Sequence, residues 1–263
     1  MARLSPVNEN PAWSAGGQLH SRYMVKNNIL SHDEDASNPW YSEEGKAAAQ
    51  AGNLMASSNV DTSDQYAVDS WMQAPFHALG ILDPALQTVG FGSYREANGG
   101  LQMGASLDVL RGLGTEKTTA YPVMWPGDGA TTPLGVFWGE HPDPLTSCPG
   151  YSAPSGLPII LQIGPGHLTP QVSASSFKQG STSLEHCFFT EATYKNPTPD
   201  SQNLGRAILN QRDAVVLIPR QPLKSGSSYT VSITVNGQNY TWSFRTAGAL
   251  HHEAAVEADI VHP

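Results

Sequence analysis

Near its C-terminal end, the chain carries the pattern that most constrains its fold, two alternating segments on either side of Asn236-Gly237. Apolar side chains occupy every second position over 229–235, and aromatic side chains do so over 240–244. Asn-Gly suits the positive φ angles of a two-residue turn, and alternation places one face of each strand against a core. The sequence therefore predicts a β-hairpin over 229–244.

Strand signals dominate the chain beyond residue 120. Apolar runs over 158–163 and 214–219 predict two more strands, whereas only a short helical turn is expected, over 201–208. The spacing Leu223-x-x-Gly226-x-x-Tyr229 predicts a tyrosine corner, with Tyr229 buried and its hydroxyl bonded to backbone near Leu223; Trp242 is expected in the core. This region resembles the bacterial Ig-like modules of surface proteins. The resemblance implies an all-β Ig-like sandwich over 123–247 that serves as a spacer or adhesion unit.

The first 115 residues predict helices around a small sheet. Asn10-Pro11 combines a good N-cap with a residue suited to the first helical turn, and the helix that follows is expected to carry His20 and close at His32. A second helix is expected from a capping box that starts at Thr62. A hairpin is expected over 89–109. Helices flanking an antiparallel sheet predict an α/β/α sandwich, so the fold class of the whole chain is α+β.

Five short motifs follow one another between His20 and Gly92: H-S-x-x-M, L-S-H, G-N-L, W-M-x-x-P-x-H and V-G-x-G. Their order and spacing resemble the CAP superfamily, which contains cysteine-rich secretory proteins, antigen 5 and plant pathogenesis-related proteins; the chain looks like its bacterial, SCP-like branch. The resemblance covers 1–115, and 116–122 is then the expected linker. Because Arg3-Leu4-Ser5-Pro6-Val7 resembles the segment after the first helix of CAP domains, this domain is expected to lack that helix.

The CAP resemblance implies a ligand site. Domains of this family bring two histidines and two glutamates together in a central cleft, which binds zinc in some members. His32 and His77 match the two histidines and are expected to face one another across this cleft. Asn53 and His20 are expected to line it.

Both carboxylates of the family pattern are missing here. Gly52 and Ala74 occupy the positions where the glutamates are expected. Because zinc sites usually have at least three protein ligands, His32 and His77 alone predict zinc binding that is weak or absent. A Gly52→Glu replacement would then be expected to strengthen zinc binding.

The two cysteines, Cys148 and Cys187, match neither a zinc ribbon nor a C-x-x-C redox motif. In an exported protein they predict one structural disulfide. The alternative is a pair of buried free thiols, and the sequence leaves both interpretations open. We take the disulfide as the prediction.

The composition excludes several classes of partner. Lys and Arg number 14 against 23 Asp and Glu, a formal net charge of −9, and no basic cluster is present, so nucleic acid is not an expected partner. No apolar run is long enough to span a bilayer as a transmembrane segment. The 25 Gly and 20 Pro residues are typical of a turn-rich extracellular or cell-surface protein. The tail over 248–263 is expected to be disordered.

No G-x-S-x-G, P-loop or H-E-x-x-H motif occurs, and no catalytic residue can be assigned, so an enzyme is not the favoured reading. Two hypotheses follow. In the first, the chain is a secreted or cell-surface binding module for a small apolar or lipid-like ligand, with extracellular partners and the Ig-like domain as spacer. In the second, it is a divergent metal-dependent hydrolase acting on peptide or cell-wall material.

Overall fold

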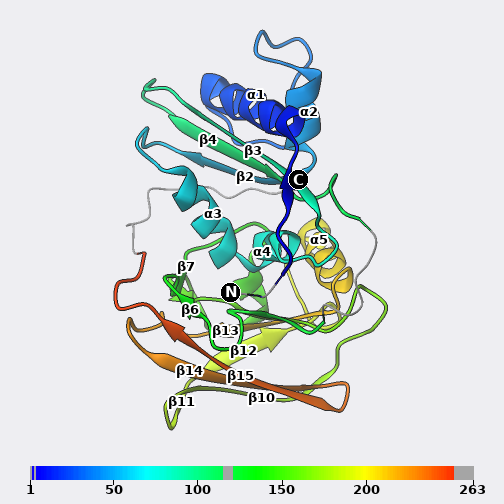
Figure 1. Ribbon diagram of the computed structural model, residues 1–263, viewed down its shortest axis with the longest axis vertical. Coiled ribbons are helices and arrows are strands. Elements are labelled where there is room, and N and C mark those ends of the chain that lie inside the picture. The colour runs from blue at the N-terminus through cyan, green and yellow to red at the C-terminus, as the bar shows by residue number, and fades with distance from the viewer. Residues whose placement is uncertain (1, 3, 115–120, 252–263) are drawn as a thin grey trace. The chain divides into compact units, whose positions relative to one another are not determined.

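The computed structural model describes residues 2, 4–114 and 121–251 (Figure 1). Within these residues the chain forms two compact units. The N-terminal unit contains 5–72 and 85–114, and the C-terminal unit contains 73–84 and 121–251. Residues 116–120 of the expected linker and 252–263 of the expected tail lie outside the described residues. Residues 73–84 thus join the C-terminal unit, although the sequence boundary placed them in the first domain.

The N-terminal unit is built on a four-stranded sheet in the order β1-β3-β4-β2. The hairpin of β3 and β4 is antiparallel and confirms the one predicted over 89–109. Strand β2 pairs antiparallel with β4, whereas β1 pairs parallel with β3. The strands are β1 (Asn8–Glu9), β2 (Gly52–Ser57), β3 (Thr88–Arg95) and β4 (Met103–Asp108).

Helix α1 (Pro11–Asn27) begins where the sequence predicts. The Asn10 side chain accepts hydrogen bonds from the backbone N–H groups of Ala12 and Trp13, which have no partner inside the helix. The expectation that the helix closes at His32 is wrong. Asn28 adopts a left-handed conformation (φ 51°) and caps the helix there, so His32 lies in the irregular segment that follows.

Two further helices belong mainly to this unit. Helix α3 (Asp64–Gln73) starts one residue later than predicted, because Ser63 Oγ caps the N–H of Tyr66 while the Thr62 hydroxyl bonds Ser57 instead. Helix α2 (Glu43–Ala49) was not predicted; Ser42 caps it through the N–H of Gly45. Its seven residues carry no long apolar repeat, which explains why periodicity did not reveal it.

Strand β3 shows why helices cover both faces of this sheet. Gly92 lies so close to α1 that an added Cβ would clash with the backbone N of Gln18. The neighbouring Phe91 meets Trp71 of α3 edge-on, with ring centroids 6.4 Å apart. Because successive residues of a strand point to opposite faces, α1 and α3 pack on opposite sides of the sheet. The predicted α/β/α layering is therefore present in this unit (Figure 1).

The C-terminal unit contains two main sheets and one two-stranded sheet. All neighbouring strands are antiparallel except β15 and β6, which are parallel. The strand orders of the three sheets are β11-β10-β14-β15-β6, β12-β13-β9-β5 and β7-β8. The strands are β5 (Val123–Trp125), β6 (Thr131–Thr132), β7 (Val136–Phe137), β8 (Ser155–Gly156), β9 (Ile159–Gln162), β10 (Val172–Gln179), β11 (Thr182–Ser183), β12 (His186–Phe189), β13 (Ala214–Pro219), β14 (Ser228–Val235) and β15 (Gln238–Thr246).

The predicted C-terminal hairpin and tyrosine corner are both confirmed. Strands β14 and β15 meet at Asn236 and Gly237, whose φ angles of 50° and 79° fit the Asn-Gly turn. The buried Tyr229 accepts a hydrogen bond from the backbone N–H of Lys224 through its hydroxyl at 2.7 Å. Trp242 is also buried, and its indole N–H donates to the carbonyl of Pro126 at 3.0 Å.

The helices of this unit are α4 (Pro75–Ile81), α5 (Pro199–Asn210) and the 3₁₀ helix η2 (Pro144–Ser147). Helix α5 is longer than the short turn expected there. Pro75 is the first residue of α4, where its missing N–H costs nothing. None of the described helices is long and apolar enough to cross a membrane.

Helix α4 is part of the core of the C-terminal unit. The ring of Phe76 packs against those of Tyr194 and Phe189, with centroids 5.1 and 6.2 Å away. Just beyond the helix, the side-chain amide of Gln162 donates to the carbonyl of Leu82 at 3.0 Å. The C-terminal unit therefore buries a segment that lies well before residues 121–251 in the sequence.

The disulfide between Cys148 and Cys187 confirms the prediction and excludes the alternative of two free thiols. Its Cα atoms are 5.7 Å apart, and it joins the end of η2 to β12. The bridge closes a loop of 39 positions that contains β8 to β11.

We predict that Gly92→Ala destabilises the protein by about 1–3 kcal/mol, because the new methyl group pushes α1 away from the sheet. The free energy of unfolding from chemical denaturation measures this. Gly248→Ala is the control, since a Cβ there meets no atom within 4 Å. Equal stability of both variants would contradict the close packing of α1 on β3.

Replacing both cysteines by serine should lower the free energy of unfolding by about 3–4 kcal/mol, the loop-closure term for a loop of this length. Denaturation of oxidised wild type and of the double variant gives the difference. A double change of the exposed pair Thr182 and Ser183 to alanine serves as control. A decrease in the free energy of unfolding as small as that of the control would contradict this prediction.

Candidate functional site

His20 is fully buried and uses both ring nitrogens inside the N-terminal unit. Its Nδ1 lies 2.8 Å from a carboxylate oxygen of Glu34, and its Nε2 lies 2.8 Å from the carbonyl of Ser31. Because a carbonyl only accepts, Nε2 must carry a proton. The second Glu34 oxygen accepts the backbone N–H of Ser42 at 3.0 Å. His20 therefore ties α1 to the segment 31–42, which is a structural role.

His32 is nearly buried in the same unit and has a fixed tautomer. Its Nδ1 lies 2.6 Å from the carbonyl of Ala49, so Nδ1 donates and the lone pair of the neutral ring is on Nε2. A ring nitrogen held by a carbonyl is the usual second-sphere arrangement for a histidine that binds a ligand through its other nitrogen. Asn53 is also buried and lies on β2 of this unit.

The backbone explains why the first family carboxylate position is a glycine. Gly52 opens β2 and faces Asp108 in the sheet. A Cβ added at Gly52 would clash with the carbonyl oxygen of Leu107 and lie 2.9 Å from the backbone N of Val109. The expectation that Gly52→Glu would strengthen zinc binding is therefore corrected, because β4 leaves no room for the side chain.

The second missing position, Ala74, is the N-cap of α4 and provides no side-chain cap. The carboxylate of Glu140 takes that place. Its Oε1 accepts the N–H of Phe76 at 3.1 Å, and its Oε2 accepts the N–H of His77 at 3.4 Å. The same Oε2 lies 2.9 Å from His77 Nδ1, and both side chains are fully buried.

Burial raises the pKa of the Glu140 carboxyl well above its ordinary value; the N–H groups of Phe76 and His77 oppose this shift, and the charge of Asp143 adds to it. The pKa of Asp143 is raised as well, also chiefly by burial. Glu140 was missed by sequence reasoning. It stands 63 positions after His77 in a segment without a recognisable motif, and no sequence signal links the two.

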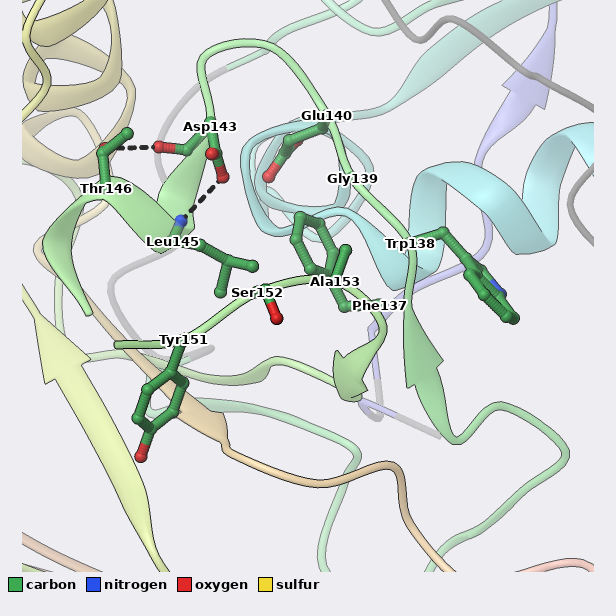
Figure 2. A pocket seen from close by; sticks show the side chains of 10 residues that line it. All are labelled: Phe137, Trp138, Gly139, Glu140, Asp143, Leu145, Thr146, Tyr151, Ser152 and Ala153. Atoms are coloured by element: carbon green, nitrogen blue, oxygen red, sulfur yellow. Dashed lines mark hydrogen bonds between the residues drawn. The ribbon is translucent and has the colours of Figure 1, made fainter. Parts of the chain in front are cut away.

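Glu140 and Asp143 line one pocket of about 550 Å³ in the C-terminal unit (Figure 2). The carboxylate of Asp143 accepts the N–H of Leu145 at 2.8 Å, which holds the start of η2. Trp138 is 43% exposed and extends along one side of the pocket, and Tyr151 lies on another. Apolar side chains, the carboxyl group of Asp143 and an exposed aromatic side chain thus line the pocket, whereas the carboxylate of Glu140 is buried against α4.

The described residues do not fit a bound zinc ion. Among 2, 4–114 and 121–251, no group of three or more His, Cys, Asp or Glu side chains is placed to hold a metal. Glu43 and Glu44, which lie between His32 and Asn53 in the sequence, are exposed in the first turn of α2, and Glu43 accepts the hydroxyl of Tyr41 at 2.5 Å. This hydrogen bond raises the pKa of Tyr41 to about 12.

The structure thus distributes the expected site residues over both units. His20, His32 and Asn53 lie in the N-terminal unit, and His77 lies in the C-terminal unit. That His32 and His77 face one another remains a prediction.

Residues 1–104 match the family model described as CAP, the cysteine-rich secretory protein family. This match supports the CAP resemblance for the N-terminal part of the chain. It includes His20, His32, Asn53 and His77 but ends before Glu140 and the pocket. No curated protein matches the chain.

We predict that Gly52→Glu lowers the free energy of unfolding by at least about 1–3 kcal/mol and gives no gain in zinc affinity. The side chain has to displace the backbone of β4 before it can reach any ligand. Chemical denaturation and zinc titration calorimetry, with Gly248→Glu as control, measure both effects. Tight zinc binding at unchanged stability would contradict this account of β2.

Proposed function

We propose that this protein is a secreted or cell-surface binding protein that takes a small apolar or lipid-like ligand in the pocket at Trp138. The observation that carries the proposal is the pocket itself. Its volume of about 550 Å³ lies within the range of small-molecule sites, and Phe137, Leu145 and Ala153 give it apolar walls. The CAP resemblance placed the ligand in the cleft of the first domain; the pocket adds a site beyond the family match.

The charge of the pocket narrows the ligand class. Asp143 provides a carboxyl group, and no Lys or Arg is among the lining residues. An anionic head group would be repelled there, whereas a neutral hydroxyl or an ammonium group could bond to a carboxyl. The exposed face of Trp138 suits an alkyl chain or a cation equally well. We therefore propose an amphiphile with a neutral or cationic head group.

The extracytoplasmic location rests on two supports. The family matched by residues 1–104 is described as secretory. Disulfides such as Cys148–Cys187 persist in oxidising compartments and are rare in the cytosol. In this proposal the C-terminal sandwich is an Ig-like module that contributes surface contacts to extracellular partners.

The alternative function is a metal-dependent hydrolase acting on peptide or cell-wall material. It would need a metal and a general acid–base pair near it. With Gly52 and Ala74 at the family carboxylate positions, those groups would have to come from elsewhere. Hydrolysis of casein or peptidoglycan that a chelator abolishes would favour this alternative over the binding protein.

We predict that octylamine and octan-1-ol bind the full chain and that octanoate binds more weakly. Trp138→Ala should weaken octan-1-ol binding about 10-fold or more, because a buried aromatic surface contributes roughly 1.5–3 kcal/mol. Calorimetric titration measures the affinities. Phe188→Ala, which removes another exposed aromatic ring of the same unit, is the control. Binding that is absent, or unaffected by Trp138→Ala, would reject the pocket as the site.

A further inference from the structure

We propose that the outer face of the five-stranded sheet in the C-terminal unit binds an acidic polysaccharide, a sugar polymer that carries carboxylate groups. This outer face is formed by alternate residues of β10, β14 and β15, the three long strands of the sheet (Figure 1). The inference deepens the proposed function and rests on its cell-surface or extracellular location. It names the class of partner that the C-terminal unit contacts, and it does not depend on the ligand of the pocket.

The strand register defines the outer face. Ser176 of β10 lies opposite Ser232 of β14, which in turn lies opposite Thr241 of β15. Residues that lie opposite one another point to the same side of a sheet, and successive residues of a strand alternate between the sides. The next pair along the strands, Phe177 and Val231, is buried. The side that carries Ser176, Ser232 and Thr241 is therefore the one turned away from the core.

Hydrogen bonds between strands order the polar side chains of this face. The exposed pairs, with their distances, are Thr230–Ser243 at 2.9 Å, Ser232–Thr241 at 2.9 Å and Thr234–Asn239 at 3.0 Å. A hydroxyl that accepts one of these bonds keeps its own proton, so the face still offers donors and acceptors to a partner. Because these side chains are short, little conformational entropy is lost when a partner binds. Sugar hydroxyls, which donate and accept in the same way, suit such a face.

The charge of this sheet differs from that of the chain. The chain has 23 Asp and Glu residues, but none lies in the five strands of the sheet. The strands do carry two cations, Lys178 and Arg245, and the register places both on the outer face, where both are exposed. Among the described residues, neither side chain has a carboxylate partner. Two unpaired cations without an acid beside them in the strands complement a partner that carries negative charge.

The acidic excess of the chain belongs mainly to the other unit. Over 5–72 and 85–114, Lys and Arg number 5 against 11 Asp and Glu, a formal charge of 5 − 11 = −6. Over 73–84 and 121–251, the numbers are 7 and 8, a formal charge of 7 − 8 = −1. Because salt screens exposed charges beyond about 10 Å, the local charge of the sheet decides whether an anionic polymer can approach it.

Lys178 is the cation on which the proposal can be tested most directly. At the other side of the sheet, the carboxylate of Asp128 accepts the backbone N–H of Ser243 at 3.2 Å. Lys178 lies opposite Thr230, which lies opposite Ser243, so two strand spacings, about 10 Å, separate Lys178 from this edge. A carboxylate of the partner is therefore expected at Lys178.

Other polyanions fit this face less well. Nucleic acids carry a negative charge on every nucleotide and are bound by clusters of Lys and Arg, and anionic membranes are also bound by basic clusters. Two separated cations do not form such a cluster. An acidic polysaccharide has more hydroxyl groups than carboxylates, and the outer face likewise has more hydroxyl groups than cations.

The test measures binding of the full chain to soluble polygalacturonate by biolayer interferometry at low salt. Dextran has sugar hydroxyls without carboxylates, and polyglutamate has carboxylates without sugar hydroxyls, so these two polymers are the comparison. We expect polygalacturonate to bind more tightly than either, and added salt to weaken the binding. Absent binding, or affinity for dextran or polyglutamate equal to that for polygalacturonate, would overturn the proposal.

Two variants with matched controls locate the binding surface. Lys178→Gln should weaken polygalacturonate binding about 2- to 5-fold, the usual effect of one exposed charge. Lys195→Gln, at another exposed lysine of the same unit, should leave it unchanged. Ser232→Glu places a negative charge at the centre of the face and should weaken binding about 10-fold or more, whereas Ala207→Glu on the exposed side of α5 should not.

Equal affinities of each variant and its control would overturn the proposal. Circular dichroism shows whether Ser232→Glu is folded, and if it is not, the comparison of Lys178→Gln with Lys195→Gln decides. Failure of the proposed function is seen separately, in the affinity for octan-1-ol. Polygalacturonate binding without octan-1-ol binding would support the outer face and reject the ligand of the pocket. Octan-1-ol binding without polygalacturonate binding would reject the outer face alone.

Discussion

Burial of one carboxylate at the start of α4 is the constraint on which the C-terminal unit depends. The Glu140 side chain is fully buried, and the backbone N–H groups of Phe76 and His77 lie in the first turn of α4, where the helix itself supplies no acceptor. The buried carboxylate and the two N–H groups would each be destabilising without a hydrogen-bond partner, and here they serve as partners for one another. Because the contact joins the segment 73–84 to the loop after β7, it fixes both α4 in the C-terminal unit and one side of the pocket.

Much of the fold could be predicted because it depends on local chemistry. The start of α1 was predicted from Asn10 before a proline, and the last hairpin from Asn236-Gly237 between alternating strands. Both signals act on the backbone within a few residues, and both predictions are confirmed. Tyr229 is an intermediate case, since its bond to Lys224 spans only five positions. The α/β/α layering was predicted from helices that flank an antiparallel sheet, and the close approach of α1 to Gly92 shows how tightly one of these helices packs.

The features that could not be predicted depend on contacts between distant segments. One exception is local: Thr62 looked like an N-cap, but its hydroxyl bonds Ser57, five positions earlier, and the cap passes to Ser63. Gly52 looked like a lost ligand, and only the register of β2 against β4 shows that backbone fills the space of its side chain. Glu140 lies beyond the end of the family match, so the family pattern alone could not predict that it contacts His77.

The three histidines of the family pattern differ in what their ring nitrogens contact, and this difference assigns their roles. All are buried, and each has an acceptor at Nδ1: Glu34 for His20, Ala49 for His32 and Glu140 for His77. In His20 the other nitrogen is held by the carbonyl of Ser31, so this ring can only stabilise the fold. His32 faces a carbonyl, which cannot donate, so its Nδ1 carries a proton. His77 differs from the other two in that the carboxylate at its Nδ1 comes from a segment beyond the family match and also accepts the backbone N–H groups at the start of α4, so this ring depends on a part of the chain that the family pattern does not include.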